Sequence, residues 1–441
     1  MTRAPAFAIE TYGCQMNEAD SELMAGVLLG NGYERAAGLG DADVIIVNTC
    51  AVRERAERRA LGRVGELKRH KRPGAVLGVV GCMAQRLGER LLQRAPHVDF
   101  VAGPDGLRHL PTLIRAAAEG DRGVATAFDP AEHYEGIVPA RSPGAQAWVT
   151  VQRGCDYRCT FCVVPMTRGP ERSRKLGDVV REVEAAASGG TTEVTLLGQT
   201  VSSYHDGERD FSDLLRAVGE VDGIRRIRFV SPHPGDFSDR LVDALAEVEA
   251  VCEHVHLPAQ SGSSAVLRRM LRGYSRELYL DVVSRLRSRV AGLAVTTDLM
   301  VGFPGETDSD FAATMSLVEA AGFDDAFTFR YSPREGTAAA RLPDQVPGEV
   351  AAERLSVLIE AVRRTARARN AALVGSVAEV LVEREARHGG LLQARTRDHR
   401  TVLLEGPASW IGTYRAVRLS GTTGATFTGA APSPALEGVG A

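Results

Sequence analysis

The chain has 441 residues, of which 44% are hydrophobic and 25% charged, a composition typical of globular proteins of about three domains. The formal net charge is −3, so overall charge does not indicate a nucleic-acid-binding protein, and only local basic clusters could do so. The sequence has no run of 18 apolar residues and no apolar core of signal-peptide length near its start, so we expect a cytoplasmic protein without a membrane association. In a reducing compartment its seven cysteines would be metal-bound or catalytic rather than disulfide-bonded.

The first third of the chain repeats a pattern of strand, cysteine and helix. The predicted strands cover residues 7–11, 43–48 and 75–80. Such alternation predicts a parallel sheet whose strand carboxyl ends lie along one edge, where ligands bind in open α/β sheets. Taken singly, Cys14, Cys50 and Cys82 would each be interpreted as an inert buried residue. Together they are expected to converge, and a metal site with three thiolates becomes the better hypothesis.

The helix predicted after Cys50 is rich in basic residues. These are Arg53, Arg55, Arg58, Arg59, Arg63, Lys68, Arg69, Lys71 and Arg72. Glutamates are interspersed, so the helix could present either a salt-bridged, solvated face or a surface for RNA. Residues 129–146 then contain several prolines and glycines without periodicity, which predicts a linker between residues 1–128 and the next domain.

A second group of cysteines lies in one loop, with the spacing Cys155-x3-Cys159-x2-Cys162. No fourth cysteine or histidine nearby completes the four ligands of a structural zinc site. Three thiolates on a four-iron cubane would leave one iron free to bind a substrate or cofactor. A zinc knuckle is the alternative. Basic residues surround the loop and would suit a phosphate backbone, unless they are surface residues without a partner. They are Arg153, Arg158, Arg168, Arg172, Arg174 and Lys175.

Strand and helix patterns alternate six times after residue 147, which fits a partial (β/α)6 barrel. The strands are predicted over residues 148–152, 193–197, 227–230, 254–257, 295–301 and 326–331. Active sites of such barrels lie at the strand carboxyl ends, and the cysteine loop follows the first strand. His233 follows the third strand and, between two prolines, fits a loop histidine better than a catalyst. Cys252 belongs to neither cysteine group and is expected to be a small buried hydrophobe.

The last part of the chain changes to short strands with glycine-rich turns, which predict a small closed barrel. The strands are expected over residues 376–382, 391–396, 401–404, 414–419 and 425–429. Arg395, Arg397, His399 and Arg400 would form a basic loop on it. Residues 434–441 are expected to be a disordered tail.

The loop Cys-x3-Cys-x2-Cys, with Phe161 before its last cysteine, resembles the radical S-adenosylmethionine (SAM) enzymes. A narrower resemblance, to the methylthiotransferases of that superfamily, is carried by blocks along nearly the whole chain. The blocks are Thr11 to Asn17, Asn48-Thr49-Cys50, Gly81-Cys82, Thr167-Arg168-Gly169, Leu197-Gly198-Gln199, Ser231 to Pro234, His256 to Gly262, Val301 to Thr307 and Tyr331 to Arg334. The C-terminal barrel is similar to the TRAM domain, an RNA-binding module.

The resemblance implies an α/β fold with three domains: an N-terminal parallel α/β domain (1–128), a radical SAM barrel (147–370) and a TRAM-like barrel (371–433). It implies two [4Fe-4S] clusters, an auxiliary one on Cys14, Cys50 and Cys82 and a SAM-cleaving one on the loop cysteines, the residues closest to catalysis. By the same analogy, the residues expected to contact SAM are Gln199, Gln260 and Ser261.

The implied reaction is methylthiolation of C2 of isopentenyladenosine at tRNA position 37, with SAM as both methyl donor and source of the 5′-deoxyadenosyl radical. The target base has to leave its stack to reach the barrel. The expected partners are tRNA and an electron donor such as a flavodoxin or ferredoxin, and the expected state is a monomer. Sister enzymes act on threonylcarbamoyladenosine in tRNA or on a ribosomal-protein aspartate; Thr200 and Ser202 replace the asparagines usual in the isopentenyladenosine branch. A non-catalytic iron–sulfur or zinc RNA-binding protein is the alternative from another class.

Overall fold

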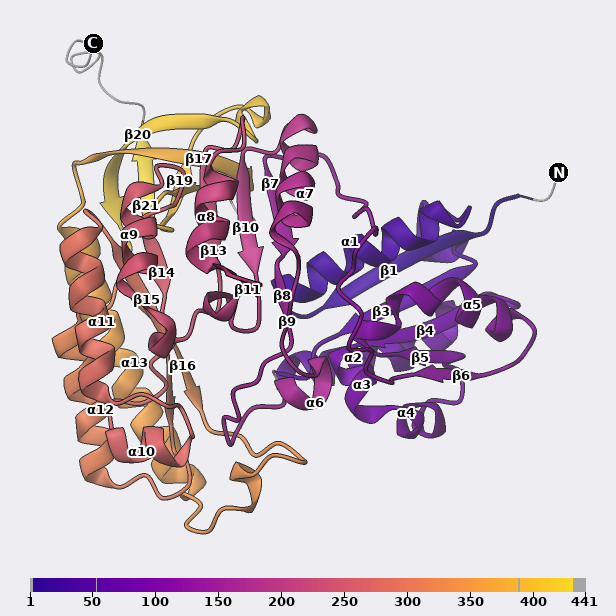
Figure 1. The fold of residues 1–441 in the computed structure, drawn as a ribbon, viewed down its shortest axis with the longest axis horizontal. Helices are drawn as coiled ribbons and strands as arrows, with labels where there is room; N and C mark the ends of the chain where they lie inside the picture. Colours follow the sequence, from indigo (N-terminus) through magenta and orange to yellow (C-terminus); the bar gives the residue numbers. More distant parts are fainter. Residues whose placement is uncertain (1–2, 53, 388, 431–441) are drawn as a thin grey trace.

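A computed structural model describes residues 3–52, 54–387 and 389–430 (Figure 1). An N-terminal sheet, drawn in indigo and purple, lies beside a central half-barrel, and a small closed barrel, in yellow, covers one end of the half-barrel. Within the described residues, no helix combines the length and apolarity that crossing a lipid bilayer requires. The predicted α/β architecture with a small C-terminal barrel is confirmed.

The N-terminal sheet is parallel throughout and has the strand order β2-β1-β3-β4-β5-β6. Its strands are β1 (Ala6–Tyr12), β2 (Glu34–Arg35), β3 (Val44–Thr49), β4 (Val76–Gly81), β5 (Phe100–Ala102) and β6 (Gly123–Ala125). Its helices are α1 (Gln15–Gly30), α2 (Glu54–His70), α3 (Cys82–Leu87), α4 (Glu89–Arg94) and α5 (Leu110–Ala118). The three predicted strands are β1, β3 and β4. The sequence analysis missed β2, β5 and β6 because runs of two or three residues carry no detectable period.

Helices cover both faces of this sheet, which explains why β3 and β4 are buried at every position. On one face, α1 and α5 contribute Met24 and Ile114 to a core. On the other, α2 and α3 contribute Val64 and Met83 to a second core. Burial of both faces holds the parallel strands in register, so that β1, β3 and β4 end at the same edge.

The half-barrel has six parallel strands in sequence order. They are β7 (Gln146–Thr150), β10 (Glu193–Leu197), β13 (Arg226–Phe229), β14 (His254–His256), β15 (Ala294–Val301) and β16 (Asp325–Arg330). A bridge between Ile227 and Val251 connects the first three strands to the last three. The outer helices are α7 (Leu176–Ser188), α8 (Phe211–Gly219), α9 (Asp239–Glu247), α10 (Ser264–Arg269), α11 (Arg276–Arg289), α12 (Asp308–Ala321) and α13 (Gly348–Ala371). All six strands lie at or next to their predicted positions.

A short hairpin that the sequence analysis missed frames the cysteine loop. It pairs β8 (Gln152–Arg153) with β9 (Arg172–Ser173), and the chain between them holds the three cysteines and α6 (Val164–Arg168). A second small hairpin joins β11 (His205–Asp206) and β12 (Arg209–Asp210). Two-residue strands depend on their partner, so the local sequence does not predict them.

The C-terminal barrel closes in the order β17-β18-β19-β21-β20. Its strands are β17 (Val377–Glu385), β18 (Leu392–Thr396), β19 (Thr401–Leu404), β20 (Tyr414–Thr422) and β21 (Thr426–Ala430), all close to prediction. Val380, Val402 and Phe427 lie in its small core. The predicted tail at 434–441 lies outside the described residues.

The predicted basic loop of this barrel packs against the half-barrel and is not a free RNA-binding surface. Arg397 pairs with Glu253 at 2.9 Å, and Arg400 pairs with the buried Asp324 at 2.6 Å, both at the amino-terminal end of the half-barrel. The ring of His399 stacks on that of His254, with centroids 4.6 Å apart. Arg395 pairs with Glu383 within the small barrel itself. These side chains therefore fasten the C-terminal barrel over the bottom of the half-barrel, which corrects the sequence-based interpretation.

Most of the arginines predicted to bind phosphate near the cysteine loop form the joint with the N-terminal sheet. Arg153 and Arg172 both donate to the buried carboxylate of Asp105, at 2.8 and 2.9 Å. Arg153 also lies over the ring of Tyr134, 3.5 Å from its centroid. Tyr134 belongs to residues 126–145, which have no helix or strand yet pack between the two units. Buried charges require partners, and these arginines have theirs inside the protein.

Some of the remaining basic residues are paired within the protein and others are exposed. Arg174 is buried against Glu182, whereas Arg158 and Lys175 are exposed. Arg63 on α2 pairs with Glu10 at 2.7 Å, and Arg72, just after this helix, pairs with Asp43 at 2.6 Å. Both pairs agree with the salt-bridged interpretation of this basic segment. Arg53 lies outside the described residues.

Candidate active site

Cys14, Cys50 and Cys82, the strand-end triad, meet at the carboxyl edge of the N-terminal sheet, as predicted. They directly follow β1, β3 and β4, or the turn after them, and all three line one cavity of about 910 Å³. The neighbouring Cys50 side chain lowers the pKa of the Cys14 thiol, and burial opposes this shift. Burial raises the pKa of Cys82. Three residues that are far apart in sequence thus form one sulfur-rich surface.

Two buried asparagines that the sequence analysis missed hold this edge together. The side chain of Asn48 donates to the backbone oxygen of Asn17 at 2.8 Å, and that of Asn17 donates to the oxygen of Thr49 at 3.2 Å. The side-chain oxygen of Asn17 also accepts the backbone N–H of Cys14 at 3.2 Å. Their positions three residues after Cys14 and two before Cys50 were the available signal, since a buried asparagine needs hydrogen-bond partners.

A glycine precedes Cys82 because no other residue fits. Gly81 has a φ of 93°, and an added Cβ would lie 2.5 Å from the side-chain oxygen of Asn48 and 2.6 Å from the oxygen of Thr49. Both the left-handed backbone and the close approach favour glycine. Gly81 therefore allows Cys82 to begin α3 next to the other two cysteines.

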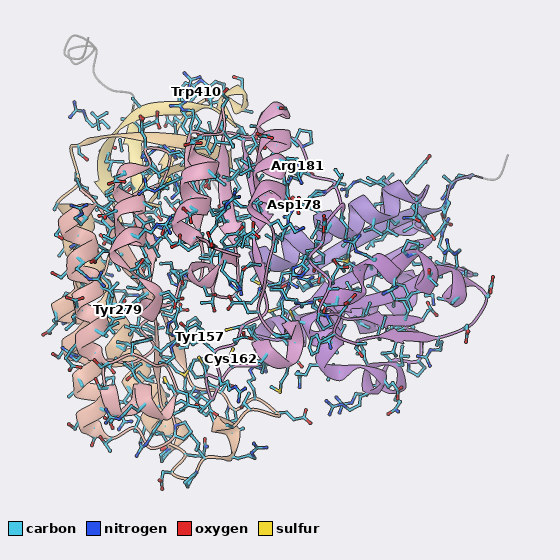
Figure 2. All side chains as sticks on the ribbon, viewed as in Figure 1. Tyr157, Cys162, Asp178, Arg181, Tyr279 and Trp410 are labelled. Carbon is cyan, nitrogen blue, oxygen red and sulfur yellow. The ribbon has the colours of Figure 1, made fainter. Side chains whose placement is uncertain are left out.

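Cys155, Cys159 and Cys162, the loop triad, curl between the half-barrel and α6; Figure 2 labels Cys162 and Tyr157 in this region. The backbone N–H of Cys162 donates to the oxygen of Cys159 at 3.0 Å, which tightens the loop. The sulfur of Cys155 lies 3.2 Å from the hydroxyl of Thr200, which follows β10. Burial raises the pKa of Cys155 and raises that of Cys162 to about 12.

The start of the loop is fixed by two glutamines, Gln152 in β8 and Gln199 just after β10. The side-chain oxygen of Gln199 accepts the backbone N–H of Gly154 at 2.5 Å, and that of Gln152 accepts the N–H of Gln199 at 2.8 Å. Gly154 has a φ of 72°, and a Cβ there would overlap the oxygen of Pro170. Gly154, before Cys155, is thus restricted to glycine for the same two reasons as Gly81, before Cys82.

His233 proves to be a buried part of the site. Its ring stacks on Tyr157 with centroids 3.9 Å apart, and its Nδ1 accepts the N–H of Gly235 at 3.2 Å. Burial, together with the charge of Arg272, lowers its pKa to about 3, so the ring is neutral at physiological pH. The Tyr157 hydroxyl donates to Asp236 at 2.5 Å. This cluster locks Tyr157, and so the loop between Cys155 and Cys159, against the half-barrel.

The three residues predicted to contact SAM have different environments. Gln199 lines the cavity as well as binding Gly154. Gln260 is buried, has a φ of 66° and pairs with β15 through its backbone. Ser261 is also buried, and its hydroxyl accepts the N–H of Ser263 at 3.1 Å, at the turn into α10. Cys252 is buried away from both triads, as expected.

The two triads are physically connected through the chain that follows Cys162. Val163 packs in one apolar cluster with Ala51 and Cys82. Five residues further, Arg168 at the end of α6 donates through its Nε to the sulfur of Cys82 at 3.2 Å. The loop triad and the strand-end triad therefore occupy neighbouring positions at the joint between the two units.

Each triad offers three cysteine sulfurs to a metal cofactor. In the described part of the chain, no three cysteine, histidine or acidic side chains are grouped tightly enough to ligate one metal ion. In a four-iron cubane each thiolate binds a different iron, so the sulfurs can lie further apart than ligands of one zinc. Three soft sulfur donors with buried surroundings fit an iron–sulfur cluster with an open iron in both places.

The cavity extends from the strand-end triad along the inside of the half-barrel. Gly198, Gln199 and Ser231 line it at the strand carboxyl ends, and His254 and Asp324 line it near the C-terminal barrel. A volume of about 910 Å³ lies in the range of ligand pockets. It offers space for a substrate beside the sulfur-rich surface.

Three families match consecutive parts of this chain. Residues 6–103 match the family described as Uncharacterized protein family UPF0004, residues 149–318 the Radical SAM superfamily, and residues 371–428 the TRAM domain. The first match contains the strand-end triad and the second contains the loop triad.

Curated relatives resemble the chain over nearly its whole length. A tRNA-2-methylthio-N(6)-dimethylallyladenosine synthase of Geotalea uraniireducens is 45% identical over 427 residues, covering 95% of this chain and 97% of that protein. One from Acidothermus cellulolyticus is 47% identical over 386 residues, covering 86% of this chain and 78% of that protein. Among solved structures, the radical S-adenosylmethionine methyltransferase TsrM of Kitasatospora setae, with cobalamin and a [4Fe-4S] cluster bound, has a TM-score of 0.59 at 16% identity and covers 77% of this chain and 74% of its own. That similarity concerns the fold alone.

Proposed function

Because the chain belongs to the tRNA-2-methylthio-N(6)-dimethylallyladenosine synthase family, we propose that its two cysteine triads are the ligands of the clusters that this enzyme uses. The protein is a radical SAM methylthiotransferase. It transfers a methylthio group to C2 of N6-isopentenyladenosine at position 37 of tRNA. Its cofactors are SAM and [4Fe-4S] clusters.

In the proposed assignment, Cys155, Cys159 and Cys162 hold the SAM-cleaving cluster, and Cys14, Cys50 and Cys82 hold the auxiliary cluster. When bound, SAM supplies the methyl group and the radical, and the clusters supply the electron and the sulfur. The protein's own contribution is to position SAM and the two clusters relative to each other. The observation that carries the proposal is the contact of Val163 and Arg168, just after the loop triad, with Cys82 of the strand-end triad.

Gln199 and Gln260 are the proposed SAM contacts, and Ser261 completes this group. Gln199 supports the idea best, because it faces the cavity while its side-chain oxygen binds Gly154. A Gln199→Ala variant would therefore loosen the loop before Cys155 as well as weaken SAM binding. Isothermal titration of SAM to the reconstituted protein is the direct measurement.

The domain limits remain those inferred above, with the auxiliary cluster in 1–128, a linker at 129–146, the radical SAM domain in 147–370 and the RNA-binding barrel in 371–433. The lack of helix or strand from 126 to 145 supports the linker. We further propose that the enzyme acts as a monomer in the cytoplasm. It would receive electrons from a donor such as a flavodoxin or ferredoxin.

The function is tested by nucleoside analysis of tRNA. Deleting the gene should remove the 2-methylthio mark from isopentenyladenosine, and the intact gene should restore it. A matched complementation with Cys50→Ala should leave unmethylthiolated isopentenyladenosine. An unchanged nucleoside profile in the deletion strain would reject the assignment, and loss of a threonylcarbamoyladenosine derivative instead would identify a sister activity.

A further inference from the structure

Each triad contains one cysteine whose sulfur accepts a hydrogen bond from a buried arginine. Arg168 donates to Cys82 at 3.2 Å, and Arg272 donates through Nη1 to Cys159, also at 3.2 Å. Both arginines are at least nine-tenths buried. The two contacts look equivalent, but the surroundings of the two guanidinium groups differ.

The charge of Arg168 is neutralised by a carboxylate. Its Nη2 donates to Asp20 at 2.6 Å, and both side chains are almost fully buried. The Asp20 carboxylate also accepts the hydroxyl of Tyr134 at 3.2 Å. Arg168 and Asp20 together therefore present a dipole to Cys82 and no net charge.

Arg272 has no carboxylate partner among the residues that the structure describes. Its Nε donates to the hydroxyl of Tyr274 at 3.1 Å, its guanidinium lies 5.3 Å from the centroid of that ring, and its Nη1 donates to Cys159. The Tyr274 hydroxyl in turn donates to the backbone oxygen of Ala259 at 2.9 Å, so it is fully occupied and uncharged. A buried cation needs a counter-charge, and the group that Arg272 contacts directly and that a bound cluster would make negative is the sulfur of Cys159.

We propose that Arg272 is a positioning residue that favours the reduced state of the cluster held by the loop triad, whereas the neutralised Arg168 leaves the auxiliary cluster largely unbiased. This rests on the proposed function, since it presumes clusters at both triads. One electron from an external low-potential donor enters the cluster and no bond changes, so the added negative charge falls beside an uncompensated guanidinium. Hydrogen bonds to the sulfurs and nearby net charge are recognised determinants of cluster potential.

The backbone supports this role. The N–H of Thr160, next to Cys159, donates to the oxygen of Met270 at 3.0 Å, and the Thr160 hydroxyl donates to the oxygen of Arg269 at 3.1 Å. The backbone of Arg269 and Met270 is thus fixed against the cysteine loop just before Leu271, which has a φ of 55° and turns the chain toward Arg272. The guanidinium is held at Cys159 by a rigid segment rather than by a mobile side chain alone.

The test is an anaerobic redox titration of the reconstituted full-length protein, followed by electron paramagnetic resonance, with dithionite or titanium(III) citrate as reductant. It is repeated in a Cys50→Ala background, so that the loop cluster is observed alone. We expect Arg272→Gln to lower the reduced-to-oxidised ratio at a fixed potential by about tenfold or more, a shift of about 59 mV to more negative values for one electron. Arg272→Lys, which keeps the charge but not the planar fork, should shift less.

Arg268→Gln is the matched control, because Arg268 lies four residues earlier, on α10, and is exposed. The cluster potential of this variant should equal that of the wild type. An unchanged potential in Arg272→Gln, with its four irons retained, overturns the inference, as does an equal shift in the control. If Arg272→Gln assembles no cluster, Arg272→Lys decides: a cluster with a small negative shift supports the inference, and loss of the cluster in both variants overturns it. Failure of the proposed cluster assignment is distinct, because the wild type itself would then bind no iron, and failure of the proposed substrate is read from the tRNA nucleoside profile.

Discussion

The two cysteine triads reach the same kind of surface by opposite routes. The loop triad is a continuous stretch of eight residues held between two strands of a hairpin. The strand-end triad is gathered from three strands and depends on the register of a whole parallel sheet. One site is therefore specified locally and the other by topology. The comparison teaches that damage to the sheet should destroy the second site and spare the first.

The largest expected effect separates the two sites chemically. Cys155→Ala should abolish SAM cleavage, lowering it by about a thousandfold or more, and with it the methylthiolated product. Cys50→Ala should abolish the product but leave reductive SAM cleavage largely intact. Iron should fall from about eight to about four atoms per chain in both variants. Loss of SAM cleavage in Cys50→Ala would show that the two triads are not independent.

The next largest effect concerns the joint between the half-barrel and the N-terminal sheet, which places the two triads near each other. Asp105→Asn leaves Arg153 and Arg172 buried without their carboxylate, so the free energy of unfolding should fall by about 3–5 kcal/mol. Urea denaturation measures it. Asp239→Asn is the control, since the Asp239–Arg285 pair is exposed and should cost less than about 1 kcal/mol. Equal losses of unfolding free energy in the two variants would mean that the buried pairs of Asp105 contribute no more stability than an exposed pair.

A matched pair of glycine variants sharpens the comparison further. Gly81→Ala should displace Cys82, and Gly154→Ala should displace Cys155, each at a cost of about 1–3 kcal/mol from a strained backbone and a close contact. We expect the first to deplete the auxiliary cluster and the second to deplete the SAM-cleaving cluster. Iron content and resonance spectra of each variant distinguish the outcomes. Depletion of both clusters by one glycine variant would contradict the independence of the sites.

The smallest expected effect is a pH dependence at the joint. Burial raises the pKa of Glu22 from its ordinary 4.5 to about 7, with Arg141 opposing and Glu182 reinforcing the shift. The folded protein therefore retains a proton that the unfolded chain loses, and stability should fall as pH rises from about 4.5 through 7, by about 1–2 kcal/mol. Glu22→Gln should remove this slope in denaturation curves measured from pH 4.5 to 8. An unchanged slope would mean that other groups cause it.

The sequence predicted elements wherever a period or a spacing was long enough to detect. Six half-barrel strands, five strands of the small barrel and three strands of the N-terminal sheet came from such patterns. The short strands β2, β5, β6, β8 and β9 did not, because two or three residues become a strand only when a neighbour supplies the hydrogen bonds. The hairpin of β8 and β9, which frames the loop triad, was not predicted for this reason.

Arginine roles were the weakest part of the sequence analysis. Arg153 and Arg172 were interpreted as candidates for contact with a phosphate backbone, and Arg397 and Arg400 as members of a basic loop. All four pair with carboxylates at the two joints of the half-barrel. A sequence gives the charge of a residue but not the distance to its partner, which here lies between 48 and 144 positions away. His233 was underestimated for the same reason, since its stacking partner Tyr157 belongs to another strand's loop.

By itself, the sequence determined the chemistry: three thiols in one loop with an open fourth position, and three more at the ends of alternating strands. Residue type and spacing suffice for this, because metal affinity follows from the donor atoms. Only the tertiary structure decided which groups surround those thiols. The pairing of Arg168 with Asp20 and the lack of such a partner for Arg272 in the described chain follow from packing between distant segments. Burial then strengthens the electrostatic interaction of each charge with the nearby sulfur, because water no longer screens it.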